Sequence, residues 1–314
     1  MKKRQMITAL LLAAVLTGCG QSAQAGQEVK IQTGEWIRLN GLQCSAADAS
    51  SNNKVTDKLQ PLLAQEEEAG AIADNDITTE ASIQGSGFGD ITTMDNSVNG
   101  RELPIYCVET DEKKVALSFD AAWGNEDTAE ILAILKAHNI HATFFMTGGW
   151  VESYPEDVKA ILADGHDLGN HSENHKNMSE ISDAEKEEEL MAVHRKVKEI
   201  TGYDMFLFRP PYGDYDNALI EVAKDCSYYA IQWDVDSLDW QNKGLDNIIE
   251  TVTMHKNLGN GSIILCHNGA EYTAQALDGL ITGLEAKGYE IVPISRLIYK
   301  DHYHMKADGT QVSG

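Results

Sequence analysis

Five short clusters of polar residues stand out because their side chains are those that acid–base and metal chemistry use. A carboxylate and an imidazole can move protons near neutral pH, and two histidines four residues apart can share one divalent metal ion. The clusters are Ser118-Phe-Asp120, His171-Ser-Glu-Asn-His175, Arg209-Pro-Pro-Tyr-Gly213, Asp236-Ser-Leu-Asp-Trp240 and Leu265-Cys-His267. Each cluster alone also fits a structural role, and His267 alone would fit a core histidine. Their order along the chain is the informative feature.

Most of the clusters follow or end a short apolar run typical of a buried strand. Strands are expected at residues 115–119, 142–146, 206–208, 230–233, 262–265 and 290–292. Helical patterns lie between these strands, at 216–225, 245–257 and 273–287 among others. Two earlier helices are expected to begin with a capping box, one formed by Asp127 and Glu130 and the other by Ser182 and Glu185. This alternation predicts an α/β fold with a mostly parallel sheet, closed or partly closed into a barrel. The active site is then expected at the carboxyl ends of the strands.

The five clusters in this order resemble the polysaccharide deacetylases, a carbohydrate esterase family with a NodB-type domain. The resemblance covers about two thirds of the chain, from Arg101 to Ile298. The run from Val115 to Gly124 is in addition similar to the spore-associated branch of Gram-positive bacteria. The resemblance implies a distorted (β/α) barrel and a hydrolase that removes N-acetyl groups from an amino-sugar polysaccharide, most plausibly peptidoglycan.

The resemblance also implies roles for individual residues. Asp120 would be the general base, His267 the general acid, and His171 with His175 would bind a divalent metal, usually zinc. Arg209 and Asp239 would position Asp120 and tune its pKa. The backbone N–H of Tyr212 would stabilise the oxyanion, and Tyr212, Pro211 and Trp240 would contact the sugar, with Trp240 also supporting His267. Trp123 and Gly124 are expected to shape a loop, and the alternative for Trp123 is that it lines the sugar groove.

One position departs from the family pattern, in which two consecutive aspartates end the first strand. Here the pair reads Asp120-Ala121, and alanine cannot bind metal. Three interpretations follow: two histidines hold the metal with water, another carboxylate (Glu126, Asp127 or Asp214) replaces the missing ligand, or the protein binds glycan without cutting it. A lipid-anchored glycan-binding protein is therefore the alternative to the enzyme. A solute-binding lipoprotein is a third class, but it would need two similar lobes.

The N-terminus has the features of an export signal. A basic start (residues 1–4) precedes a short apolar run and Leu16-Thr-Gly-Cys19, which resembles a bacterial lipobox. We therefore expect a signal at residues 1–19, a diacylglycerol on Cys19 and an extracytoplasmic membrane-bound protein, or a secreted one if Cys19 is not lipidated. Residues 20–100, acidic and without apolar period, are expected to be a flexible spacer. The deacetylase domain is expected at 101–300, followed by a short tail at 301–314.

Charge and cysteine content limit the partners and the compartment. The formal net charge of −24 over 314 residues repels phosphate backbones, so nucleic-acid binding is not expected. Cell-wall polysaccharide is the expected partner, and the protein is expected to be a monomer. Besides Cys19, the four cysteines Cys44, Cys107, Cys226 and Cys266 would allow two disulfides in an oxidising compartment, with a connectivity that spacing does not determine.

Overall fold

The computed structural model describes residues 28–30, 36–38 and 88–314. The chain divides into two units, Met1–Ala81 and Ser82–Gly314. In the first unit, β1 (Glu28–Lys30) and β2 (Trp36–Arg38) pair antiparallel. Cys19, Cys44 and most of the expected spacer lie outside the described residues.

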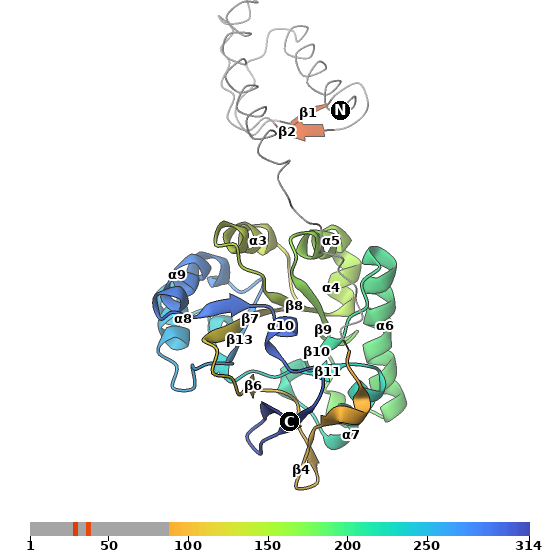
Figure 1. Cartoon of the computed structure of the whole chain (residues 1–314). Helices are drawn as coiled ribbons and strands as arrows, with labels where there is room; N and C mark the ends of the chain where they lie inside the picture. The colour runs from red at the N-terminus through yellow and green to blue at the C-terminus, as the bar shows by residue number, and fades with distance from the viewer. Residues whose placement is uncertain (1–27, 31–35, 39–87) are drawn as a thin grey trace, which may run out of the picture. The chain divides into compact units, whose positions relative to one another are not determined.

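The second unit is built on one eight-stranded sheet in which every pairing is parallel (Figure 1). The strand order is β11-β10-β9-β8-β7-β13-β12, and β14 pairs with the first part of β7. The strands are β7 (Lys114–Ala121), β8 (Thr143–Met146), β9 (Asp167–Asn170), β10 (Leu207–Phe208), β11 (Tyr229–Ala230), β12 (Val235–Asp236), β13 (Ile263–His267) and β14 (Glu290–Val292). The alternating strand and helix pattern therefore predicted the fold class correctly.

Strand β7 is the central element because it pairs with three others. Residues 115–121 are all buried, as an apolar run enclosed on both faces should be. Its register with β13 sets His267 directly beside Asp120. Two residues of the expected chemistry thus lie next to each other at the carboxyl end of the sheet.

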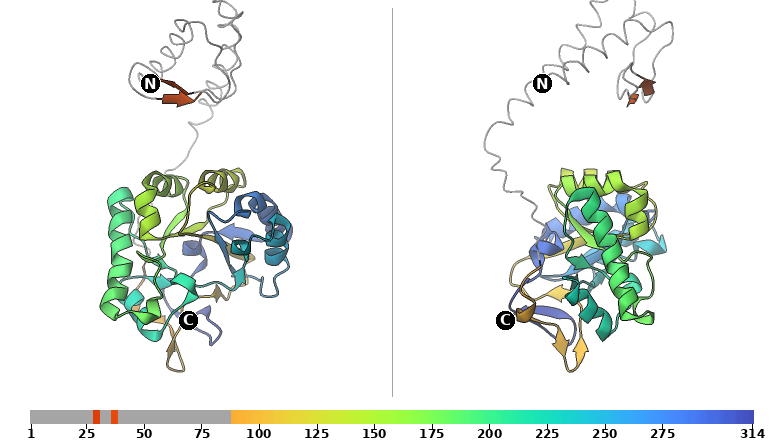
Figure 2. Two further views of the ribbon diagram at one scale, coloured as in Figure 1. Left: turned by 180° about the vertical axis from the view of Figure 1, so that it is seen from behind. Right: turned by 90° about the vertical axis from the view of Figure 1, so that its right-hand side faces the viewer.

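Helices cover the outer side of the curved sheet (Figure 2). They are α3 (Thr128–Ala137), α4 (Gly148–Ser153), α5 (Pro155–Ala163), α6 (Asp183–Thr201), α7 (Asn217–Asp225), α8 (Leu245–Thr253) and α9 (Thr273–Ala286). The short helix α10 (Ile294–Leu297) instead bonds to the first residues of β8 and β9, through Thr143 and Asp167. The capping box predicted at Ser182 and Glu185 is present at the start of α6. The one predicted at Asp127 is wrong, since that side chain makes no cap hydrogen bond and instead accepts from the backbone N–H of Gly269.

The chain itself bridges the two edge strands of the sheet. Residues 231–234 run on from β11 into β12, first bonding to β10 through Ile231 N–H and Phe208 C=O (2.8 Å). They then bond to β13 through Asp234 N–H and Ile263 C=O (3.3 Å). This crossing makes the curved sheet a partly closed barrel.

The second unit is longer at both ends than the expected domain at 101–300. A second, four-stranded sheet has the order β3-β15-β16-β6 and joins β3 (Met94–Asp95) and β6 (Cys107–Val108) to β15 (Tyr303–Met305) and β16 (Thr310–Ser313). A hairpin of β4 (Ser97–Val98) and β5 (Arg101–Glu102) lies between β3 and β6. Residues 88–100 therefore belong to the folded unit rather than to a spacer, and residues 301–314 form strands rather than a tail. Cys107, Cys226 and Cys266 are free thiols.

Two glycines with left-handed backbone test how tightly this second sheet packs against β13. Gly261 (φ 80°) precedes β13, and a Cβ there would overlap the carbonyl oxygen of Val108 in β6. Gly100 (φ 79°) lies in the β4–β5 turn with open space around it. We predict that Gly100→Ala costs about 1 kcal/mol of unfolding free energy, from backbone conformation alone. Gly261→Ala should cost about 2–4 kcal/mol because the overlap adds to that cost. Equal urea midpoints for the two variants would contradict this packing.

Candidate active site

The predicted chemical residues gather at the carboxyl ends of the parallel strands. Asp120 lies near the end of β7, His171 follows β9, Arg209 follows β10 and His267 ends β13. Asp239 lies in the short helix η5 (Asp239–Gln241) after β12. Groups far apart in sequence are thus brought to one edge of the barrel, as expected for this fold.

Asp120 is held by a buried ion pair with Arg209. A guanidinium nitrogen of Arg209 (Nη1) donates to Asp120 Oδ1 at 2.7 Å, and Nη2 donates to the carbonyl of Gln232 at 3.2 Å. The Arg209 side chain is fully buried and lies over the Phe145 ring at 4.2 Å. Burial by itself raises the pKa of Asp120, but the charges of Arg209 and of the nearby histidines outweigh it and lower that pKa below its ordinary value. Asp120 is therefore ionised at neutral pH.

His171 is fixed in one tautomer by its neighbour. Its Nδ1 lies 2.7 Å from the carbonyl oxygen of Arg209, which can only accept, so Nδ1 carries the proton. Nε2 then presents a lone pair toward Asp120 Oδ2 at 3.5 Å. Burial lowers the pKa of His171 to about 4, so the ring is neutral at neutral pH. A neutral imidazole and a carboxylate that face each other with lone pairs suit a shared cation.

His175 reaches the same place through a loop rather than through helical spacing. Ser172 and His175 both have left-handed backbone (φ 65° and 53°), and the Ser172 hydroxyl accepts from the His175 N–H at 2.9 Å. The His175 ring lies 4.9 Å from that of His171 and 4.5 Å from that of Tyr212. Burial lowers its pKa as well. The two neutral rings thus form the paired imidazoles that the spacing predicted.

Asp239 holds His267, not Asp120. Nδ1 of His267 donates to Asp239 Oδ1 at 2.7 Å, and the His267 backbone N–H donates to Oδ2 at 2.7 Å. The Thr273 hydroxyl (2.7 Å) and the Trp240 N–H (2.9 Å) also donate to this fully buried carboxylate. Burial lowers the pKa of His267, but the bond to Asp239 outweighs it and raises the pKa above its ordinary value. The prediction that Asp239 positions Asp120 is therefore corrected: only Arg209 binds Asp120, because Asp239 is used entirely at the other end of the site.

Exposed aromatic side chains surround these groups. Tyr212 (69% exposed) has left-handed backbone (φ 60°) and follows the buried Pro211 in the short helix η4 (Pro211–Gly213). Trp240 is 51% exposed and Trp123 is 53% exposed. The indole whose ring lies against His267, at 5.4 Å between centroids, belongs to Trp123 rather than to Trp240. Sequence reasoning gave Trp123 mainly a loop-shaping role, with a place in the sugar groove as the alternative, and it did not predict the contact with His267.

The donor set for a metal is incomplete in the residues that the structure describes. His171 and His175 fit such an ion in tautomer and charge, but no group of three or more histidine, cysteine or acidic side chains in the described ranges could hold one. Ala121 is buried and contributes no ligand. Of the suggested substitutes, Asp127 bonds to Gly269 and Asp214 to Ser179. Two histidines that could bind a metal ion are thus present, without a third candidate ligand in the part of the chain that the structure describes.

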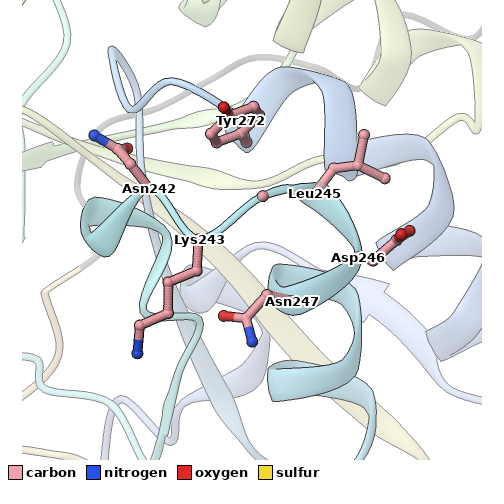
Figure 3. Close-up of a pocket in the computed structure, with 7 residues that line it drawn as sticks. Asn242, Lys243, Leu245, Asp246, Asn247 and Tyr272 are labelled. Carbon is pink, nitrogen blue, oxygen red and sulfur yellow. The ribbon is translucent and has the colours of Figure 1, made fainter.

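A pocket of about 380 Å³ lies between the loop after η5 and the residue that precedes α9 (Figure 3). It is lined by Asn242, Lys243, Gly244, Leu245, Asp246, Asn247 and Tyr272. Trp240 lies two residues before its first lining residue, and Thr273, which binds Asp239, follows its last. The pocket therefore adjoins the part of the site that holds His267 but contains none of the predicted catalytic groups.

Comparison with known proteins identifies the family. Residues 108–231 match the family model for polysaccharide deacetylase. The chain is 34% identical over 200 residues to a peptidoglycan-N-acetylglucosamine deacetylase of Bacillus cereus, covering 62% of this chain and 92% of that protein. It is 35% identical over 195 residues to the uncharacterized protein YlxY of Bacillus subtilis, covering 62% of this chain and 60% of YlxY. The chain belongs to the polysaccharide deacetylase family.

A solved structure adds a point that bears on activity. BA3943 of Bacillus anthracis, described as a CE4 family pseudoenzyme, matches with a TM-score of 0.60 and 34% identity over 63% of this chain and 69% of that one. A mutant of BA3943 with restored enzymatic activity matches equally well, with a TM-score of 0.60. Relatives of similar likeness thus include a deacetylase and a protein without activity.

We predict that Asp239→Asn lowers the pKa of His267 because it removes the anionic partner that raises that pKa. His267 would then lose its proton at lower pH than in the parent. The measurement is an NMR titration of the His267 ring, which needs no turnover. Asp236→Asn is the matched control, since Asp236 contributes the weakest of the effects that raise the pKa of His267. An equal or larger shift in the control would contradict the assignment.

Proposed function

We propose that this protein is a hydrolase that removes N-acetyl groups from amino sugars of peptidoglycan. The observation that carries the proposal is the pair of buried partners that favours opposite charge states on two neighbouring groups of one site. Arg209 favours the ionised form of Asp120, and Asp239 favours the protonated form of His267. A base and an acid that are set apart in this way are what hydrolysis of an amide requires.

The reaction follows from these groups. Asp120 takes a proton from water as the water oxygen attacks the acetamide carbonyl carbon. The oxygen that gains negative charge needs a donor, for which the backbone N–H of Tyr212 is our candidate. The C–N bond then breaks as His267 gives its proton to the leaving nitrogen, which yields acetate and a free amine. Each of the two proton-transfer groups should contribute about 10²–10⁴-fold to the rate.

His171 and His175 are the residues that would hold a metal ion in this proposal. When bound by His171 and His175, a divalent ion such as zinc would polarise the carbonyl and acidify its bound water. A water molecule would have to serve as ligand in place of the aspartate that the family has at position 121, and the affinity for the metal should be low for that reason. The alternative function, a lipid-anchored protein that binds glycan without cutting it, is favoured by this one observation at Ala121 and by the likeness to an inactive relative.

We further propose that the protein acts as a monomer at the outer face of the cell membrane, with a lipid on Cys19, close to the wall polymer. The support for this is the lipobox-like sequence before Cys19. Among the helices that the structure describes, none has the length and apolar character needed to cross a bilayer. A Cys19→Ala protein should leave the membrane fraction.

We predict that the purified protein, with zinc, cobalt, manganese or nickel, releases acetate from peptidoglycan or a chitooligosaccharide. Asp120→Asn should reduce that release by at least about 10²-fold, since the base is removed while the shape is kept. Asp278→Asn, on the exposed side of α9, is the control and should leave the rate unchanged. If no acetate is released with any of these metals, the proposed deacetylase activity is contradicted and the glycan-binding alternative remains.

We also predict that Ala121→Asp raises zinc affinity at least about tenfold, since it supplies the third ligand. Isothermal titration with zinc measures this directly. Ala122→Asp adds the same charge one residue further on and is the matched control. If both variants bind zinc as the parent does, Ala121 is not the position that limits metal binding.

A further inference from the structure

The loop that follows β7, residues 122–127, contains a half-exposed tryptophan, Trp123, that the functional roles above do not use. Trp123 is one of six large apolar side chains exposed in the described residues, the others being Ile91, Tyr212, Trp240, Leu245 and Met254. Its ring lies 5.4 Å from the ring of His267, with 32° between their planes. It therefore stands directly beside the group proposed to protonate the leaving nitrogen.

The backbone around Trp123 is held from two sides. The carbonyl of Gly124 accepts from the indole N–H of Trp150 (3.1 Å) and from the side-chain amide of Asn268 (3.2 Å). Asp127 accepts from the N–H of Gly269 with both oxygens at 2.9 Å. These bonds tie the loop to α4 and to the segment after β13, while the indole of Trp123 stays in contact with solvent.

Such an arrangement is costly unless the indole has a partner. A rigid loop that presents an apolar ring to water loses the free energy that burial would provide. The loop has no need of this ring for its own anchoring, because Gly124, Asn125 and Asp127 make the hydrogen bonds. A fixed, flat, apolar surface beside a hydrolytic site is suited to the apolar face of a pyranose ring, and its rigidity reduces the ordering cost of binding.

We propose that Trp123 is a substrate-positioning residue on which a sugar ring of the β-linked amino-sugar chain stacks, so that the acetamide nitrogen comes within reach of His267. The proposal rests on the proposed function for the identity of the polymer. The Trp123 ring lies beside His267, while the Tyr212 ring packs beside His175 on the side of the paired histidines. The sugar chain lies across the site between these aromatic rings.

The test is isothermal titration with tetra-N-acetylchitotetraose. Trp123→Ala should weaken binding roughly tenfold, the loss expected for one aromatic stacking contact, and Trp123→Phe should keep most of the affinity. Met254→Ala, which removes a more exposed side chain (75%) at the end of α8, is the control and should bind as the parent does. Where turnover is measurable, Trp123→Ala should raise KM more than it lowers kcat.

Two results would overturn the proposal: Trp123→Ala binding as tightly as the parent, or no binding of the tetrasaccharide by the parent at millimolar concentration. Thermal unfolding checks that the variants fold, and Trp123→Gln replaces the alanine variant if that one does not. Binding that depends on Trp123 without acetate release would sustain the inference while the proposed deacetylase activity fails. Acetate release that does not change when Trp123 is replaced would sustain the proposed deacetylase activity and contradict the inference about Trp123.

Discussion

The buried ion pair between Arg209 and Asp120 is the interaction on which the rest of the site depends. Neither group could stay charged there alone, since an unpaired charge in the interior costs several kcal/mol. The Arg209 guanidinium also lies over the Phe145 ring, and the Arg209 backbone carbonyl fixes the tautomer of His171. One residue thus sets the charge of the base and the lone pair of a predicted metal ligand.

The two halves of the site are electrostatically distinct. Around Asp120, two neutral histidines leave room for an added positive charge. Around His267, Asp239 already supplies the negative charge, and four hydrogen bonds to that carboxylate hold it in place. Alanine in place of the family's aspartate at position 121 therefore affects only the half of the site around Asp120. This separation explains how a family member can keep its acid and base groups after its metal ligands have changed.

Much of the fold and the convergence of the site could be predicted from local sequence. The apolar run in β7 and the capping box at Ser182 are short-range signals that no distant contact overrides. The failures share a cause in long-range contacts. Asp127 makes no helix-capping hydrogen bond because its carboxylate accepts instead from the backbone N–H of Gly269, which is 142 residues away in the sequence. Asp239 was assigned to the wrong partner because sequence order does not tell which strand end faces which. Strands of two to four residues, such as β3 and β15, have no period to detect.

The second sheet has a consequence for how this chain reaches its native state. Its strands join residues about two hundred positions apart, with Met94 beside Tyr303 and Cys107 beside Thr310. Closing such long loops is slow, and neither edge can be completed while one end of the chain is still missing. The four-stranded sheet is therefore expected to be among the last parts of this unit to form, because it needs both ends of the unit at once.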